Sequence, residues 1–300
     1  GTTLPGRQHS AQAPCPGGEG HVFLPRMSKI TSMQTAKKNS VLVQAPIISH
    51  AKVKSRYFKI SLHAPAIAKQ AQPGQFVMLK VADGLTPLLR RPLSIHNVSG
   101  SQIELLYEVV GRGTELLSRK KAGGTLDLTG PLGSGFKISK TAQRQPILVA
   151  GGMGVAPLLF LAKNLKSRKG LVLIGCRTAE QVLCEKEFKK AGFSVTIATD
   201  DGSRGFRGRV TALLERQLSA IDHRLSTIYA CGPKPMFGEL ARICKGNAIP
   251  AQVSLEAHMA CGIGACLGCV VETQSGYQRV CTEGPIFDIE QLRWEKARRE

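Results

Sequence analysis

Four cysteines near the carboxyl end of the sequence are spaced closely enough to share a cation. Cys261, Cys266 and Cys269 form a C-x4-C-x2-C pattern, and Cys281 follows later in the chain. This spacing with a later cysteine is the plant-type pattern for a [2Fe-2S] cluster. Three glycines stand between the first three cysteines, where they allow a loop to wrap closely around iron and sulfide. The sequence therefore predicts these four cysteines as cluster ligands.

Two other uses of clustered cysteines stay open. A structural zinc site also takes four cysteines, but usually from two C-x2-C knuckles, and only Cys266 and Cys269 are so spaced. A disulfide framework is typical of small secreted chains, whereas this chain has 300 residues and an odd number of cysteines, nine. The cysteines without a partner pattern are interpreted as ordinary thiols: Cys15, Cys176, Cys184 and Cys244.

A second group of residues combines guanidinium groups with a hydroxyl at the start of a predicted strand, in the stretch Arg90-Arg91-Pro92-Leu93-Ser94. An arginine can grip a pyrophosphate through paired hydrogen bonds, and Ser94 can bond the edge of a flavin ring. Further along, Gly111-Arg112-Gly113-Thr114 precedes a predicted helix, whose free N–H groups favour phosphates. Either motif alone is more often a surface turn. Their joint occurrence favours a flavin.

A third group follows two predicted strands and is suited to a nucleotide. The turn Gly151-Gly152-Met153-Gly154 is not the G-x-G-x-x-G fingerprint, but glycine between strand and helix lets a phosphate approach backbone N–H groups. Cys231-Gly232-Pro233 stands at the carboxyl end of another strand, where open α/β sheets bind ligands. A simple tight turn and a buried cysteine stay open as alternatives. The predicted contacts are Gly151, Gly152, Gly154, Cys231, Gly232 and Pro233.

The elements that must position these residues change in type near residue 146. Before it, six strand-length segments separated by turn residues predict a small antiparallel barrel. After it, strands alternate with helices, which predicts a doubly wound parallel sheet. The expected barrel strands are 41–48, 57–62, 76–81, 93–98, 103–110 and 125–128, with a helix at 114–120. The expected sheet strands are 147–150, 171–176, 194–199 and 227–231, and the helices are 158–165, 180–191, 209–217 and 233–245.

The predicted fold class is therefore multidomain, a β-barrel followed by an α/β domain and a small cluster domain. The expected boundaries are a disordered extension at 1–40, a flavin-binding barrel at 41–142, a nucleotide-binding α/β domain at 143–250 and a [2Fe-2S] domain at 251–300. The extension is expected to be disordered because it is rich in Gly, Pro, Ser, Thr and Gln and lacks apolar periodicity.

The bulk composition excludes some classes of partner. The net charge is +20, but lysine and arginine are scattered without a long basic block or a nucleic-acid-binding motif, so no nucleic-acid partner is predicted. The charge instead suits the attraction of anionic nucleotides or an acidic protein. No apolar run approaches the roughly 18 to 20 residues that span a bilayer. Free cysteines together with a cluster motif predict the cytoplasm.

The order of these motifs resembles that of the ferredoxin-reductase superfamily, and within it the electron-transfer subunits of type B dihydroorotate dehydrogenase. The likeness covers roughly residues 41–290, and its most specific part runs from Glu256 through Met259 to Cys269. The motifs that carry it are Arg91-Pro92-Leu93-Ser94, Gly113-Thr114, Gly130-Pro131-Leu132-Gly133, the stretch 151–158, Cys231-Gly232-Pro233 and the stretch 256–281.

This resemblance implies FAD in the barrel, NAD in the α/β domain and a [2Fe-2S] cluster in the C-terminal domain. The FAD contacts that it carries over are Arg91, Pro92, Leu93, Ser94, Tyr107, Gly113 and Thr114. It also implies an FMN-containing catalytic subunit, joined with this chain in a heterotetramer, that oxidises dihydroorotate in pyrimidine biosynthesis. Electrons would pass from FMN through the cluster and FAD to NAD, and no residue of this chain is predicted to be catalytic.

Two alternatives to this function stay open. The same cofactors occur in the flavin subunit of an NAD(P)-dependent ferredoxin reductase, a sulfide dehydrogenase or a hydrogenase, where only the partner differs. A zinc-stabilised binding module with unused nucleotide pockets is an alternative from another class.

Overall fold

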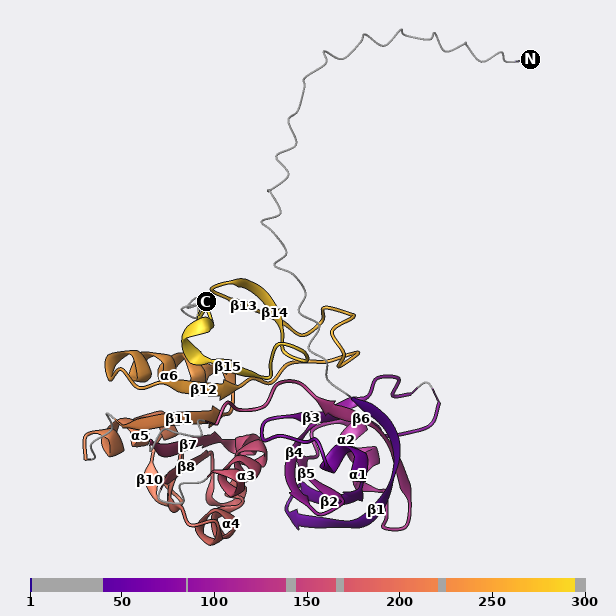
Figure 1. The fold of residues 1–300 in the computed structure, drawn as a ribbon, viewed down its shortest axis with the longest axis horizontal. Helices are drawn as coiled ribbons and strands as arrows, with labels where there is room; N and C mark the ends of the chain where they lie inside the picture. The colour runs from indigo at the N-terminus through magenta and orange to yellow at the C-terminus, as the bar shows by residue number, and fades with distance from the viewer. Residues whose placement is uncertain (2–39, 85, 139–143, 166–169, 221–224, 295–300) are drawn as a thin grey trace. The chain divides into compact units, whose positions relative to one another are not determined.

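The computed structural model describes residues 1, 40–84, 86–138, 144–165, 170–220 and 225–294. Residues 38–300 form one unit, in which a barrel precedes a sheet (Figure 1). The extension predicted to be disordered, residues 1–40, lies outside the described residues except at its two ends. Within the described ranges, no helix is both long and apolar enough to cross a membrane.

The first six strands close into an antiparallel barrel in the order β1-β2-β5-β4-β3-β6, which confirms the predicted barrel (Figure 1). Ile103 and Leu105 of β5 are buried and alternate with partly exposed residues, because neighbouring side chains on a strand point to opposite faces. The strands are β1 (Val41–Lys54), β2 (Tyr57–His63), β3 (Phe76–Lys80), β4 (Arg91–Ser99), β5 (Gln102–Glu108) and β6 (Thr125–Leu132). The barrel helices are α1 (Pro65–Ala68) and α2 (Arg112–Ser118).

A seven-stranded sheet follows, in the order β10-β9-β8-β7-β11-β12-β15. Every neighbouring pair is parallel except β12 and β15, so the doubly wound parallel sheet is confirmed. The strands are β7 (Gln145–Gly151), β8 (Leu171–Cys176), β9 (Ser194–Thr199), β10 (Phe206–Arg207), β11 (Ser226–Cys231), β12 (Ala251–Ser254) and β15 (Ile286–Asp288). The α-helices are α3 (Val155–Asn164), α4 (Glu185–Lys190), α5 (Val210–Leu218) and α6 (Lys234–Gly246), and the short 3-10 turns are η1 (Gly152–Gly154), η2 (Ala179–Gln181) and η3 (Ile289–Gln291).

Helices bury both faces of this sheet. Ile147 and Val149 of β7 belong to the core beneath α5 and α6, whereas Leu148 and Ala150 belong to the core beneath α3 and α4. A strand buried on both faces reads as a continuous apolar run, which is why the segment after residue 146 was recognisable in the sequence.

The C-terminal part of the chain adds β12 and β15 to the sheet. The segment between these two strands lies outside the sheet. Residues 255–285 form the cysteine-bearing loops and a hairpin of β13 (Val270–Thr273) and β14 (Gly276–Arg279). Strands from both sides of the expected boundary at residue 250 therefore share one sheet. The expected domain boundaries stay a prediction.

Barrel and sheet are joined through α3, which packs against β4. The ring Nδ1–H of His96 in β4 donates to the carbonyl of Ala156 at 2.8 Å, and Phe160 of α3 is buried in the barrel core. Lys137, after the barrel, pairs with Asp288 of β15 at 3.0 Å. The start of β4 and the end of β11 line the same cavity in the joined structure.

Candidate functional site

A cavity of about 940 Å³ lies where the barrel, the sheet and the C-terminal loops meet. Its volume is at the upper end of the range for small-molecule sites, as a dinucleotide needs. It is lined from β4, β5, α2, the turn before α3, the end of β11 and residues 255–259, 270–272 and 292–294. The predicted cofactor-binding residues that line it are Arg91, Pro92, Leu93, Ser94, Tyr107, Thr114, Cys231, Gly232 and Pro233.

The guanidinium of Arg91 lies over the backbone at the start of α2. A Cβ atom on Gly113 would lie 2.2 Å from Arg91 Nε, so only glycine leaves room for the guanidinium. The neighbouring Arg90 is instead paired with Asp127 of β6, with 2.7 Å between Nη1 and Oδ1. Arg91, which lines the cavity, is therefore the arginine of this pair that a phosphate there can reach, and its guanidinium suits the pyrophosphate of a dinucleotide.

Tyr107 forms part of the cavity wall in a fixed orientation. Its hydroxyl lies 2.8 Å from Nε2 of His50, whose Nδ1 lies 2.7 Å from the carbonyl of Lys120. Because a carbonyl only accepts, Nδ1 carries the hydrogen, and Nε2 accepts the hydrogen bond that the Tyr107 hydroxyl donates. Phe58 stacks on the Tyr107 ring with centroids 5.9 Å apart. Burial raises the pKa of Tyr107, so its phenol stays protonated.

The glycines after β7 and β11 are required by packing between the two strand ends. A Cβ on Gly154 would lie 1.9 Å from the carbonyl oxygen of Cys231, and one on Gly232 would lie 3.1 Å from Cα of Gly151. Only Gly152, with φ +53°, faces open space. Gly113, Gly151, Gly152 and Gly154 are absent from the cavity lining among the described residues. Their contact with a cofactor stays a prediction.

Several lining residues were not predicted from the sequence. Glu256 is one: burial raises its pKa, and the negative charge of Glu108 adds to the shift. Burial likewise raises the pKa of the Cys231 thiol, with a further contribution from Glu256. Recognition of a strand at 251–254 in the sequence would have found Glu256, because β12 pairs with β11 in parallel and Glu256 follows β12 at the end of the sheet where Cys231 lies. Other residues missed in the sequence are Phe76, Glu108, Met153, Lys234 and Trp294.

The four cysteines of the C-terminal loops gather as two pairs. The Cys266 N–H points at the sulfur of Cys261 at 3.4 Å. Cys281 lies near Cys269, which raises the pKa of the Cys281 thiol together with burial. The Gly268 N–H in turn points at the sulfur of Cys266 at 3.4 Å. The structure thus brings all four predicted ligands together, although they are separated by up to twenty residues in the chain.

The loop favours the thiolate form at one of these cysteines. Burial raises the pKa of Cys261, but backbone N–H groups of Cys266, Ile263 and Ala265 lower it to about 6. Cys281 differs, since burial and the neighbouring Cys269 raise its pKa to about 12. Deprotonation of Cys281 therefore needs a bound cation, as is usual for a metal-coordinating thiol.

The four cysteines supply the thiolate donors that a [2Fe-2S] cluster takes. In the part of the chain that the structure describes, no three His, Cys, Asp or Glu side chains are arranged to hold one metal ion. A structural zinc takes four protein ligands at one centre, whereas a [2Fe-2S] cluster needs only two thiolates at each iron.

The cysteine loop and the cavity share one stretch of backbone. Met259, two residues before Cys261, lines the cavity, and so does Val270, the residue after Cys269. Gly262 packs on the barrel, because a Cβ there would lie 2.5 Å from Cγ of Met78 in β3. A group held by the cysteines would therefore lie next to a cofactor held in the cavity.

Two protein-family profiles match the chain. The iron-sulfur cluster binding domain of dihydroorotate dehydrogenase B matches residues 256–293, which include the four cysteines. The oxidoreductase NAD-binding domain matches residues 148–241, which include the end of β7, the glycine turn and β11.

Among solved structures, the chain is similar to the one described in "Insights into flavin-based electron bifurcation via the NADH-dependent reduced ferredoxin-NADP oxidoreductase structure". The TM-score is 0.76 with 29% identity, over 85% of this chain and 91% of the other. The ferredoxin reductase in carbazole 1,9a-dioxygenase has a TM-score of 0.60 at 20% identity, over 71% of this chain and 68% of the other, and shares the fold.

Curated relatives cover most of the chain. The electron transfer subunit of dihydroorotate dehydrogenase B (NAD(+)) from Desulforamulus reducens is 39% identical over 85% of this chain and 100% of the relative. The protein of the same description from Geobacillus thermodenitrificans is 41% identical over 80% of this chain and 94% of the relative. The chain therefore belongs to the family of electron-transfer subunits of NAD-dependent dihydroorotate dehydrogenase B.

Proposed function

We propose that the chain carries electrons between an FMN-containing dihydroorotate dehydrogenase subunit and NAD, through a [2Fe-2S] cluster and FAD. The observation that carries this proposal is the shared backbone of the cysteine loop and the cavity, where Met259 and Val270 flank the first three cysteines. When bound, the flavin exchanges an electron pair with NAD and single electrons with the cluster. The protein positions these groups beside one another.

The residues divide into three sets by what they would hold. Arg91 and Gly113 form the cradle for the FAD pyrophosphate, while Ser94 and Tyr107 present a hydroxyl and an oriented ring to the flavin. The cavity residues at the end of β11 face the nicotinamide side. The cysteine pairs Cys261 with Cys266 and Cys269 with Cys281 each hold one iron.

Purification of the tagged full chain from its native cell tests this function. We expect FAD, FMN, an iron-sulfur spectrum and a partner that oxidises dihydroorotate to elute together. FAD and iron-sulfur with another partner would keep the electron path and change the pathway, as in the ferredoxin-reductase alternative. The relatives at 39% and 41% identity favour dihydroorotate oxidation over that alternative, since the likeness to the oxidoreductase structure is 29%. A colourless product would overturn the proposal.

Arg91→Ala should weaken FAD binding. A charge-assisted hydrogen bond contributes about 1.5–3 kcal/mol, so we expect the FAD dissociation constant to rise by roughly tenfold to hundredfold. Flavin retained after gel filtration and fluorescence titration of the apoprotein measure this. Arg119→Ala is the matched control, because Arg119 directly follows α2 but is exposed, is paired with Glu115 and does not line the cavity. Equal FAD affinity in wild type and Arg91→Ala would contradict the assigned contact.

Ile263→Asp should weaken binding of the FMN-containing partner. Ile263 and Leu267 lie between the cluster cysteines yet are 59% and 60% exposed, as expected for apolar side chains that a partner covers. Loss of a central apolar contact costs about 2 kcal/mol, or roughly thirtyfold in the dissociation constant. Titration of the partner by calorimetry measures it, with an unchanged cluster spectrum expected.

Leu225→Asp is the control for this surface. Leu225 is 67% exposed and precedes β11, at the amino edge of the sheet and away from the cavity. Equal losses of partner affinity in both variants would show that the effect is general and that the cluster loop is not the docking surface.

We also propose a cytoplasmic location and the division into domains at 41–142, 143–250 and 251–300. The eight cysteines that the structure describes are free, which suits a reducing compartment. The division is supported by the end of the last barrel strand at Leu132 and by the family matches to 148–241 and 256–293.

A further inference from the structure

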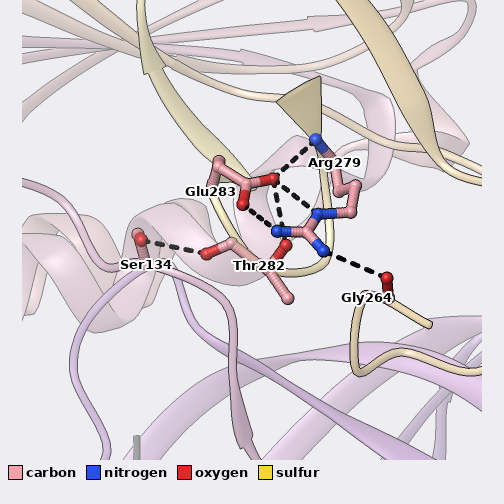
Figure 2. Close-up of polar contacts among 5 residues, drawn as sticks. All are labelled: Ser134, Gly264, Arg279, Thr282 and Glu283. Atoms are coloured by element: carbon pink, nitrogen blue, oxygen red, sulfur yellow. Dashed lines mark hydrogen bonds and ion pairs between the residues drawn. The ribbon is translucent and has the colours of Figure 1, made fainter. Parts of the chain in front are cut away.

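Arg279 joins the loop that carries the first three cysteines to the turn that follows the fourth (Figure 2). Its Nη1 donates to the carbonyl of Gly264 at 3.1 Å. Its Nε and Nη2 donate to the two oxygens of Glu283 at 3.0 and 2.5 Å, and its backbone N–H also reaches Glu283 at 2.7 Å. Arg279 is two residues before Cys281, so one side chain spans both cluster-binding segments.

The turn after Cys281 contains Glu283, the partner of Arg279, and this turn is fixed to the barrel. Ser134, which follows β6, donates its backbone N–H to the carbonyl of Gly284 at 2.5 Å and its hydroxyl to the carbonyl of Thr282 at 3.5 Å. The hydroxyl of Thr282 donates to Glu283 at 3.0 Å. Figure 2 shows this chain of contacts, which runs from Ser134 through Thr282, Glu283 and Arg279 to Gly264. The arginine thus fixes the cysteine loop relative to the barrel.

The contact with Gly264 orients one peptide group at the cluster site. The carbonyl of Gly264 and the N–H of Ala265 belong to the same planar trans peptide and point in opposite directions. Arg279 holds the carbonyl of this peptide, and the next N–H along the loop, that of Cys266, points at the sulfur of Cys261 at 3.4 Å. Gly264 has φ +85°, and a Cβ there would lie 2.8 Å from Cγ2 of Thr282 and 3.0 Å from Arg279 Nη1, so glycine is required for this approach.

We propose that Arg279 is a positioning residue for the iron-sulfur cluster: it holds the peptide between Gly264 and Ala265, and with it the following N–H, that of Cys266, which points at the Cys261 sulfur. Hydrogen bonds to cluster sulfurs favour the reduced, more negative state and so raise the reduction potential. A planar guanidinium is needed because its donors must reach Glu283 and Gly264 at once, which an ammonium cannot do in the same geometry. The inference rests on the proposed function, since it assumes a cluster bound by the four cysteines.

The test is a redox titration of the cluster in the full chain purified with its FMN-containing partner. The electron paramagnetic resonance signal of the reduced [2Fe-2S] group monitors the titration. In Arg279→Gln we expect the ratio of reduced to oxidised cluster at a given potential to fall about tenfold, which is about 59 mV for one electron. Iron, sulfide and FAD contents and the melting temperature are measured beside it. Arg242→Gln is the matched control, because Arg242 also bonds two carboxylates, Glu215 and Glu239, on α5 and α6.

A double variant separates orientation from charge. Arg279→Gln leaves the charge of Glu283 unpaired, which would also lower the potential. Arg279→Gln with Glu283→Gln removes both charges, so its potential should stay below that of wild type if orientation of the peptide matters. A return of the double variant to the wild-type potential would overturn the inference, because charge alone would then explain the shift.

Two further outcomes are distinguishable. If Arg279→Gln does not retain a cluster, Arg279→Lys replaces it, and a smaller shift in the same direction is expected since lysine keeps the charge but loses the fork. Unchanged cluster potentials in the titrated variants, with a normal wild-type signal, would overturn only this inference and would leave the proposed function in place. A wild-type complex without a [2Fe-2S] signal would overturn the proposed function and the inference together.

Discussion

Replacing Cys266 with serine should remove the iron-sulfur cluster and leave FAD in place. Cys266 is exposed on its loop and receives the Gly268 N–H at its sulfur, so the substitution removes a thiolate without opening a core. Loss of an outer-shell partner already costs 10- to 100-fold in metal affinity, and loss of a ligand should exceed about 100-fold. Iron and sulfide content and the visible spectrum measure the loss.

The activities of this variant should separate in a specific way. Electron flow from dihydroorotate to NAD needs the cluster, so we expect it to fall by more than about 100-fold in the complex. NADH oxidation by an artificial acceptor needs only the flavin and the nucleotide contacts, which lie on the barrel and the sheet. It should persist at a rate close to that of the wild type.

Cys176→Ser provides the control for the cysteine chemistry. Burial raises the pKa of Cys176 to about 11, and its sulfur donates to the carbonyl of Gln181 at 3.4 Å, a bond that a serine hydroxyl can also make. This variant should keep the cluster and both activities. A full cluster in Cys266→Ser would contradict the ligand assignment.

The sequence was most informative where the signal is local. β8 and β9 have the bounds that were predicted; β8 is a short apolar run between turns, which marks a strand buried on both faces. The cysteine spacing is equally local, since three of the four predicted ligands lie within nine residues. β1 was predicted too short: it continues to Lys54, where residues 51–53 are exposed and give no alternating pattern.

The sequence was least informative where contacts are distant. β12 and β15 have four and three residues, and Val253 pairs with Phe287, so neither strand has a pattern of its own. The role proposed for Arg279 depends on the carbonyl of Gly264, fifteen residues away, and a backbone acceptor has no sequence signature. The glycine turn was predicted for a phosphate, whereas the structure gives Gly154 a different requirement, the proximity of Cys231.

That requirement predicts a large loss of stability in Gly154→Ala. The added Cβ would lie 1.9 Å from the Cys231 carbonyl oxygen, and 2.5 Å from its carbonyl carbon, so backbone must move and not merely a flexible side chain. Overpacking costs about 1–3 kcal/mol and occasionally more, and a clash between two strand ends should lie at the upper end. We expect the melting temperature to fall by about 10 °C, with a loss of NAD binding, because β7 and β11 separate at the cavity.

Gly238→Ala should change stability in the opposite direction and so controls for the glycine-to-alanine exchange itself. Gly238 lies within α6, and a Cβ there meets nothing within 4 Å. Alanine in a helix interior is favoured over glycine by about 0.5–1 kcal/mol, so this variant should melt slightly higher than the wild type. Thermal unfolding of both variants, followed by circular dichroism and flavin fluorescence, gives the comparison. If Gly154→Ala has the melting temperature of the wild type, the two strand ends can separate at little cost. The glycine would then be required for nucleotide binding and not for packing.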